Sequence, residues 1–135
     1  MSTSSRRNTD EAAMRELVER WANAVRDKDV DGILSSHSTD MLMFDVPPPV
    51  EAKGIDAYRK TWDSFFSWCD DPVIFEITDM HIAAGADVAF VAALMRCAGV
   101  ENGKRIELEF RLTIGLRKAG DRWMVVHEHH SIPAA

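Results

Sequence analysis

The chain has 135 residues, of which 46% are apolar and 28% charged, and its net charge is −6. These values are typical of one globular domain, and the acidic balance argues against nucleic acid as a partner. No apolar run approaches the length of a membrane span, and the N-terminus lacks the apolar part of a signal peptide. The two cysteines show no disulfide or metal-site spacing. We therefore expect a reduced, cytoplasmic protein without cofactor or metal.

Helical patterning dominates the first half of the chain. Asn8 and Glu11 fit a helix-start box, so we expect residues 1–7 to be a disordered tail and 8–135 a single domain. Asp29 is expected to cap a short second helix, and Gly54 to precede a third. The apolar positions at helical spacing are Met14, Leu17, Val18, Trp21 and Val25 in the first helix and Ile55, Tyr58, Trp62, Phe65 and Phe66 in the third.

Strand patterning dominates the second half. Before it, Met41–Val46 alternates as a strand that three prolines end, which sets Asp45 on the face of Met41 and Met43. Four further strands are predicted over 73–84, 88–100, 105–117 and 122–131, with a hairpin at Asn102-Gly103. This order predicts an α+β domain, in which three helices cover a curved antiparallel sheet and leave a cone-shaped pocket for a small molecule.

Several stretches in this order carry a family resemblance. They are Arg20-Trp21, Asp29–Ile33, Phe44-Asp45 before the prolines, Gly54 with Tyr58 and Trp62, and Trp123–Ser131. Together they resemble the NTF2-like superfamily, in its SnoaL-like and ketosteroid-isomerase-like branch, from about Asn8 to the C-terminus. The resemblance implies the cone-shaped, cystatin-like fold, a pocket for a small apolar molecule, and a homodimer formed through the sheet.

Similarity to ketosteroid isomerase also implies roles for particular residues. The general-base aspartate of that enzyme falls on Asp45, its oxyanion-hole tyrosine on Trp21, and its protonated aspartate on Thr113. The base position matches and both oxyanion donors differ, so the same steroid chemistry is not implied. SnoaL-like polyketide cyclases also use a carboxylate in this pocket, so isomerase, cyclase and dehydratase chemistry all remain open.

The last hairpin decides which residues share the pocket. With Ala119-Gly120 as a two-residue turn, Arg111 lies opposite Glu128, and one face carries both residues together with Thr113 and His130. The resemblance places this polar face toward the pocket, whereas periodicity alone buries the opposite, apolar face. On the first interpretation, Arg111 and Glu128 form an ion pair at the pocket floor and His130 relays a proton; on the second, the pair is an ordinary surface contact.

Further residues have both a structural and a functional interpretation. The Trp21 indole is a core residue or a donor to a ligand carbonyl, and Trp62 and Phe66 fill the core or line the pocket mouth. His127 and His129 share a strand face but no spacing supplies a third metal ligand. Two functions therefore stand: an acid–base enzyme with Asp45 as general base, or a non-catalytic ligand-binding or dimerisation module.

Overall fold

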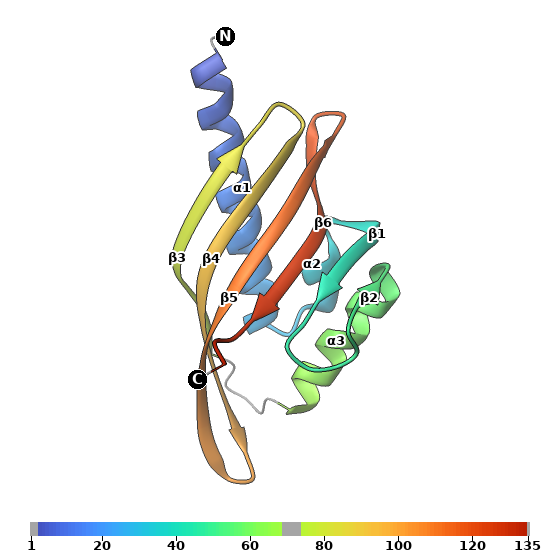
Figure 1. Ribbon diagram of the computed structural model, residues 1–135, viewed down its shortest axis with the longest axis vertical. Helices are drawn as coiled ribbons and strands as arrows, with labels where there is room; N and C mark the ends of the chain where they lie inside the picture. The colour runs from blue at the N-terminus through green and yellow to red at the C-terminus, as the bar shows by residue number, and fades with distance from the viewer. Residues whose placement is uncertain (1–2, 69–73, 135) are drawn as a thin grey trace.

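The computed structural model describes residues 3–68 and 74–134. Within these ranges, side chains are described from residue 8 onward. Helices cover one face of a curved six-stranded sheet, which confirms the predicted α+β architecture (Figure 1). Cys69 and the expected strand start at Val73 lie outside the described residues. Within the described part of the chain, no helix is long and apolar enough to cross a membrane.

The N-terminal helix α1 (Thr3–Arg26) runs along the back of the sheet in Figure 1 and packs on β3. It begins at Thr3 rather than at Asn8, so residues 3–7 are helical. Its five predicted apolar positions are all buried. The short helix α2 (Val30–Leu34) follows, and the Asp29 side chain caps it as predicted, by accepting a hydrogen bond from the Gly32 N–H at 3.1 Å.

Strand β1 (His37–Phe44) buries Met41 and Met43, and the proline segment follows it. A short strand that the pattern did not predict, β2 (Ala52–Lys53), then pairs antiparallel with β1. Gly54 has a φ of +88°, a conformation that suits glycine, and its N–H donates to the Met41 carbonyl at 2.7 Å. Helix α3 (Ile55–Trp68) therefore begins against β1 and turns Tyr58 and Trp62 into the core.

The remaining strands are β3 (Ile74–Ala84), β4 (Val88–Glu101), β5 (Lys104–Ala119) and β6 (Arg122–Ser131). The order across the sheet is β2-β1-β6-β5-β4-β3, and Asn102 and Gly103 both have positive φ in the predicted hairpin. The sheet is not wholly antiparallel as expected, because β1 and β6 run parallel. Strand β1 enters the sheet from a helix, so no hairpin dictates its direction.

A bulge in β6 corrects the predicted register of the last hairpin. Ala119 pairs with Arg122, which moves the turn to Gly120-Asp121, and Leu116 pairs with Val125. The next pair is Gly115 with His127, so Val126 is an extra residue in β6. The bulge reverses the facing of every later residue in the strand. Glu128 consequently lies opposite Ile114 and His130 opposite Leu112, and the predicted pair of Arg111 with Glu128 does not form.

The two faces of the sheet follow from this register. The face under the helices buries the apolar residues of β5 and β6, and the bulge adds Glu128 and His130 to it. Arg111 and Thr113 are exposed on the outer face, so the expectation that they face the pocket was wrong. They alternate with buried Phe110, Leu112 and Ile114, and a strand directs alternate side chains to opposite faces.

Candidate functional site

A cavity of about 400 Å³ opens between α3, the end of β1 and the inner faces of β3 to β6. Its walls are mostly apolar and aromatic. The main contributors are Met43, Trp62, Phe65, Trp68, Phe75, Leu108 and Phe110. Asp45 and His130 also line it, and no lysine or arginine is among its described lining residues. Such a hollow suits a small, uncharged organic molecule.

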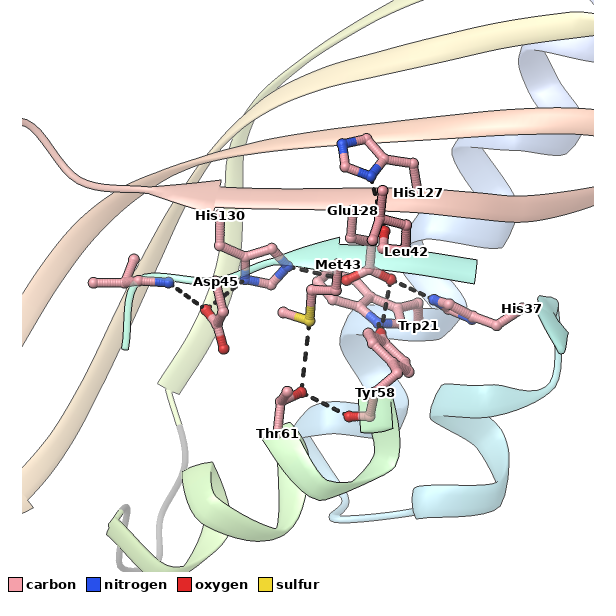
Figure 2. Close-up of polar contacts among 11 residues, drawn as sticks. Trp21, His37, Leu42, Met43, Asp45, Tyr58, Thr61, His127, Glu128 and His130 are labelled. Atoms are coloured by element: carbon pink, nitrogen blue, oxygen red, sulfur yellow. Dashed lines mark hydrogen bonds and ion pairs between the residues drawn. The ribbon is translucent and has the colours of Figure 1, made fainter. Parts of the chain in front are cut away.

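Asp45 stands at the rim of this cavity, directly after β1 and before the prolines. Its side chain is 22% exposed, and its Oδ1 accepts a hydrogen bond from the Val46 N–H at 2.8 Å. The same oxygen lies 3.9 Å from Nδ1 of His130, and the two side chains point toward each other in Figure 2. The sequence-predicted base and the sequence-predicted proton relay therefore meet at one wall of the cavity.

His130 is held firmly on β6, with its side chain only 8% exposed. Its ring stacks on Phe110, with centroids 5.5 Å apart, and meets Trp21 and Trp62 edge to face. Its Nε2 lies 3.0 Å from Oε1 of Glu128. The two ring nitrogens thus serve different partners: Nε2 contacts a buried carboxylate, and Nδ1 is directed toward Asp45.

Glu128 is wholly buried behind the cavity at the centre of a polar network (Figure 2). Its Oε2 accepts a hydrogen bond from the Tyr58 hydroxyl at 2.7 Å and contacts Nε2 of His37. The Trp21 indole N–H in turn donates to the Tyr58 oxygen at 3.0 Å. Four side chains from α1, β1, α3 and β6 therefore converge, directly or in series, on one carboxylate.

The network fixes the ionisation of two groups. Burial by itself raises the pKa of Glu128, but the attraction of His37 and the hydrogen bonds from His130 and His37 outweigh it and lower the pKa to about 2. Glu128 is therefore a carboxylate at neutral pH. Burial, and then the Glu128 charge, raise the pKa of Tyr58 well above its ordinary value, so its hydroxyl stays protonated and donates.

The predicted site residues separate into three groups. Asp45, His130 and Trp62 line the cavity. Trp21 and Glu128 lie behind it and bind other side chains: the Trp21 N–H donates to the Tyr58 oxygen, and Glu128 accepts from the Tyr58 hydroxyl. Phe66 packs against Trp62, with ring centroids 6.0 Å apart, and is not among the described lining residues.

Arg111 and Thr113 form the third group, on the outer face of the sheet. Arg111 donates to the Ser131 hydroxyl at 3.2 Å, and Thr113 lies opposite His129. Neither residue reaches the cavity. The proposed correspondence of Thr113 with the protonated aspartate of ketosteroid isomerase therefore supplies no donor to this site.

Sequence reasoning missed Tyr58 and His37. Tyr58 lies on the apolar stripe of α3, where the pattern predicts a core residue. A buried tyrosine needs a hydrogen-bond partner for its hydroxyl, and this need is the signal that could have identified it. His37 precedes the predicted first strand, and only the extension of β1 back to residue 37 brings it to Glu128. No local pattern marks it.

Two other features do not assemble a comparable site. A larger hollow of about 600 Å³ between α1 and β3 is open to solvent and lined by side chains of both charges, including Arg15, Glu19 and Arg26. His127 and His129 share the outer face, where Nδ1 of His127 lies 2.8 Å from the Leu42 carbonyl oxygen. In the described part of the chain, no group of three or more side chains has the geometry of a metal site.

Comparison with known proteins identifies the family. The family model for the SnoaL-like domain matches residues 14–135. An NTF2-like protein of unknown function from Pseudomonas putida KT2440 has a TM-score of 0.83 and 34% sequence identity, over 98% of this chain and 89% of that one. Among curated proteins, no sequence match was found.

More distant structures share the fold. An NTF2-like protein with a cystatin-like fold from Novosphingobium aromaticivorans has a TM-score of 0.84 at 16% identity, over 98% of this chain and 87% of that one. A ketosteroid isomerase-like protein from Erwinia carotovora atroseptica SCRI1043 has a TM-score of 0.77 at 18% identity, over 92% and 96%. The chain therefore belongs to the SnoaL-like domain family and has the NTF2-like fold.

Proposed function

We propose that the protein binds a small, neutral carbonyl compound in the cavity and moves a proton next to the carbonyl, with Asp45 as the general base. The single observation that supports this most is the position of Asp45 and His130 side by side on the wall of a mostly apolar cavity. Acid–base catalysis needs such a pair within reach of a bound molecule that is shielded from water.

The lining of the cavity favours a neutral ligand. Aromatic rings from α3, β3 and β5 offer flat apolar walls to a planar molecule. A ligand carboxylate or phosphate would meet Asp45 without a cationic lysine or arginine among the described lining residues. A ketone or enone avoids this repulsion and still presents an acidic C–H bond.

The proposed reaction proceeds through an enolate. Asp45 removes the proton from the carbon next to the carbonyl, and this proton is then held between Asp45 and His130. When Nδ1 of His130 is protonated, its N–H supplies a donor for the negative charge on the enolate oxygen. If the proton returns to another carbon, the overall reaction is an isomerisation. If the enolate closes a ring or loses water, the reaction is a cyclisation or a dehydration.

Hydrogen–deuterium exchange tests this proposal without knowledge of the natural substrate. Neutral aryl ketones that quench the fluorescence of the cavity tryptophans are incubated with the protein in D₂O, and proton NMR follows the loss of the α-proton signal. Asp45→Asn should lower the exchange rate by about 10²–10⁴-fold, while the exposed turn variant Asp121→Asn leaves it unchanged. Binding without exchange would indicate the alternative, a non-catalytic carrier.

We also propose that the outer face of the sheet pairs with a second copy of the chain. Phe90 and Leu94 on β4 are about half exposed, at 51% and 50%. On β5, Gly115 lies opposite Phe90, Thr113 lies two pairs further along, and Arg111 lies opposite Leu94. Small side chains beside two exposed apolar ones make a flat surface that another sheet can cover.

A further inference from the structure

We infer that Glu128 is a positioning residue that holds His130 as its Nε2–H tautomer and directs a bare Nδ1 toward Asp45 and the cavity. The inference deepens the proposed function and rests on it for its catalytic meaning, because it says which atom receives the proton that Asp45 removes. The tautomer itself follows from contacts within the protein and can be measured without a ligand.

Nε2 of His130 faces the buried carboxylate of Glu128. It lies 3.0 Å from Oε1 of Glu128, which is hydrogen-bonding distance. An ionised carboxylate accepts hydrogen bonds and donates none, so the proton between these two atoms must belong to the histidine. A neutral imidazole carries one N–H, and its Nδ1 is then a bare acceptor.

The other neighbours of Glu128 keep its carboxylate as an acceptor for His130. The Trp21 N–H donates to the Tyr58 oxygen, so the hydroxyl proton of Tyr58 is directed at Glu128. Tyr58 and His37 both contact Oε2, which leaves Oε1 for His130. Every contact around the carboxylate thus supplies a donor, as a buried anion requires.

Nδ1, the other ring nitrogen of His130, is directed toward Asp45. Packing against Phe110, Trp21 and Trp62 holds the His130 ring and opposes a flip that would exchange its nitrogens. Nδ1 is 3.9 Å from Oδ1 of Asp45, which is longer than a hydrogen bond. Two acceptors facing each other keep such a distance, so the spacing agrees with a bare Nδ1.

The second histidine of the network provides a contrast. His37 also contacts Glu128 through Nε2, but its Nδ1 is buried and finds no hydrogen-bond partner among the described residues. His37 is also absent from the described lining of the cavity, so its ring nitrogens do not face a bound ligand. His130 is therefore the histidine of this network that can take up a proton from the cavity.

The catalytic consequence is a defined path for one proton. Asp45 takes it from the ligand carbon and passes it to the lone pair of Nδ1, which regenerates the Asp45 carboxylate and makes His130 an imidazolium. Glu128 faces that cation through Nε2–H, and Asp45 faces it through the new Nδ1–H. Among the residues that the structure describes, the other titratable side chains near it are Tyr58 and His37 behind Glu128, and Cys97 across the cavity.

Nitrogen-15 NMR of the histidine rings tests the inference directly. The chain is labelled at histidine, the His130 signals are assigned with His130→Gln, and the two ring nitrogens are followed from pH 5 to 9. For neutral His130 in the wild-type protein, we expect the ratio of the Nε2–H tautomer to the Nδ1–H tautomer to be at least about tenfold higher than in exposed His129. A tenfold higher ratio corresponds to about 1.4 kcal/mol.

Two variants separate positioning from other effects. Glu128→Gln should reduce the preference to that of His129, and the exposed variant Glu16→Gln should leave it as in wild type. If Glu128→Gln does not fold, Tyr58→Phe, which removes one donor to the carboxylate, should keep the Nε2–H form. Three results for His130 in the wild-type protein would overturn the inference: a ring protonated at Nδ1, the same mixture of tautomers as in His129, or a ring that stays doubly protonated up to pH 9.

The same preference in folded Glu128→Gln would also overturn it, because the carboxylate would then not set the tautomer. Failure of the proposed function gives a different result. In that case the ring nitrogens keep the expected pattern, and the ketone probes bind without exchange of their α-protons.

Discussion

Replacement of Glu128 by glutamine should make the folded protein lose a stabilisation that depends on pH. In the folded chain His37, His130 and Tyr58 surround the carboxylate, and its pKa is lowered to about 2 from an ordinary 4.5. A depressed folded-state pKa stabilises the fold above the unfolded pKa, and the stabilisation disappears as the pH falls through the folded value.

The magnitude follows from the two pKa values. A shift from 4.5 to about 2 corresponds to about 3 kcal/mol of stability at neutral pH. At pH 3 the unfolded carboxyl is mostly protonated and the folded one is not, so about 1 kcal/mol remains. The difference in unfolding free energy between wild type and Glu128→Gln should therefore shrink by about 2 kcal/mol between pH 6 and pH 3.

Urea unfolding, followed by tryptophan fluorescence at pH 6, 4.5 and 3, measures this difference. Glu16→Gln makes the same chemical change on the exposed face of α1 and should track wild type at every pH. A difference between wild type and Glu128→Gln that stays constant from pH 6 to pH 3 would refute the reasoning, since the buried carboxylate would then not be the ionised centre of the network.

Three further changes test other parts of the structure. Tyr58→Phe leaves the Trp21 N–H without its acceptor and should cost about 1–3 kcal/mol in urea unfolding; a cost near zero would contradict the hydrogen-bond chain. Gly54→Ala places a side chain at a φ of +88° and should lower the unfolding free energy by about 1–2 kcal/mol, whereas an unchanged melting temperature would argue against that conformation. Phe90→Asp should convert a dimer to a monomer in light scattering and leave ketone binding intact, and a wild-type monomer at micromolar concentration would dismiss the pairing.

Periodicity predicted the helices and most of the sheet because those signals are local. The apolar stripe of α1 and the positive-φ pair Asn102-Gly103 depend on a few neighbouring residues, and both are found where expected. The parallel pairing of β1 with β6 is not local, since it joins strands separated by most of the chain. The extension of α1 back to Thr3 was missed because the capping pattern at Asn8 fits a helix start equally well.

The candidate site was predicted only in part, and the bulge at Val126 explains much of the failure. Strict alternation placed Glu128 and His130 with Arg111, and one extra residue in β6 moved them to the opposite face. The family resemblance identified Asp45, and the hairpin face that it assigned to the pocket included His130; these two residues do meet at the cavity. It also led to Thr113 and Arg111, because it assigned the polar face of the hairpin to the pocket, whereas the buried face of β5 is the apolar one of Phe110, Leu112 and Ile114.

A crystal structure with a bound ketone that exchanges its α-proton would test the central claim most directly. We expect the ligand in the 400 Å³ cavity, with its α-carbon about 3–3.5 Å from an Asp45 oxygen and its carbonyl oxygen toward the His130 ring. A ligand bound in the open hollow between α1 and β3, or in the cavity with its α-carbon away from both Asp45 and His130, would contradict the account.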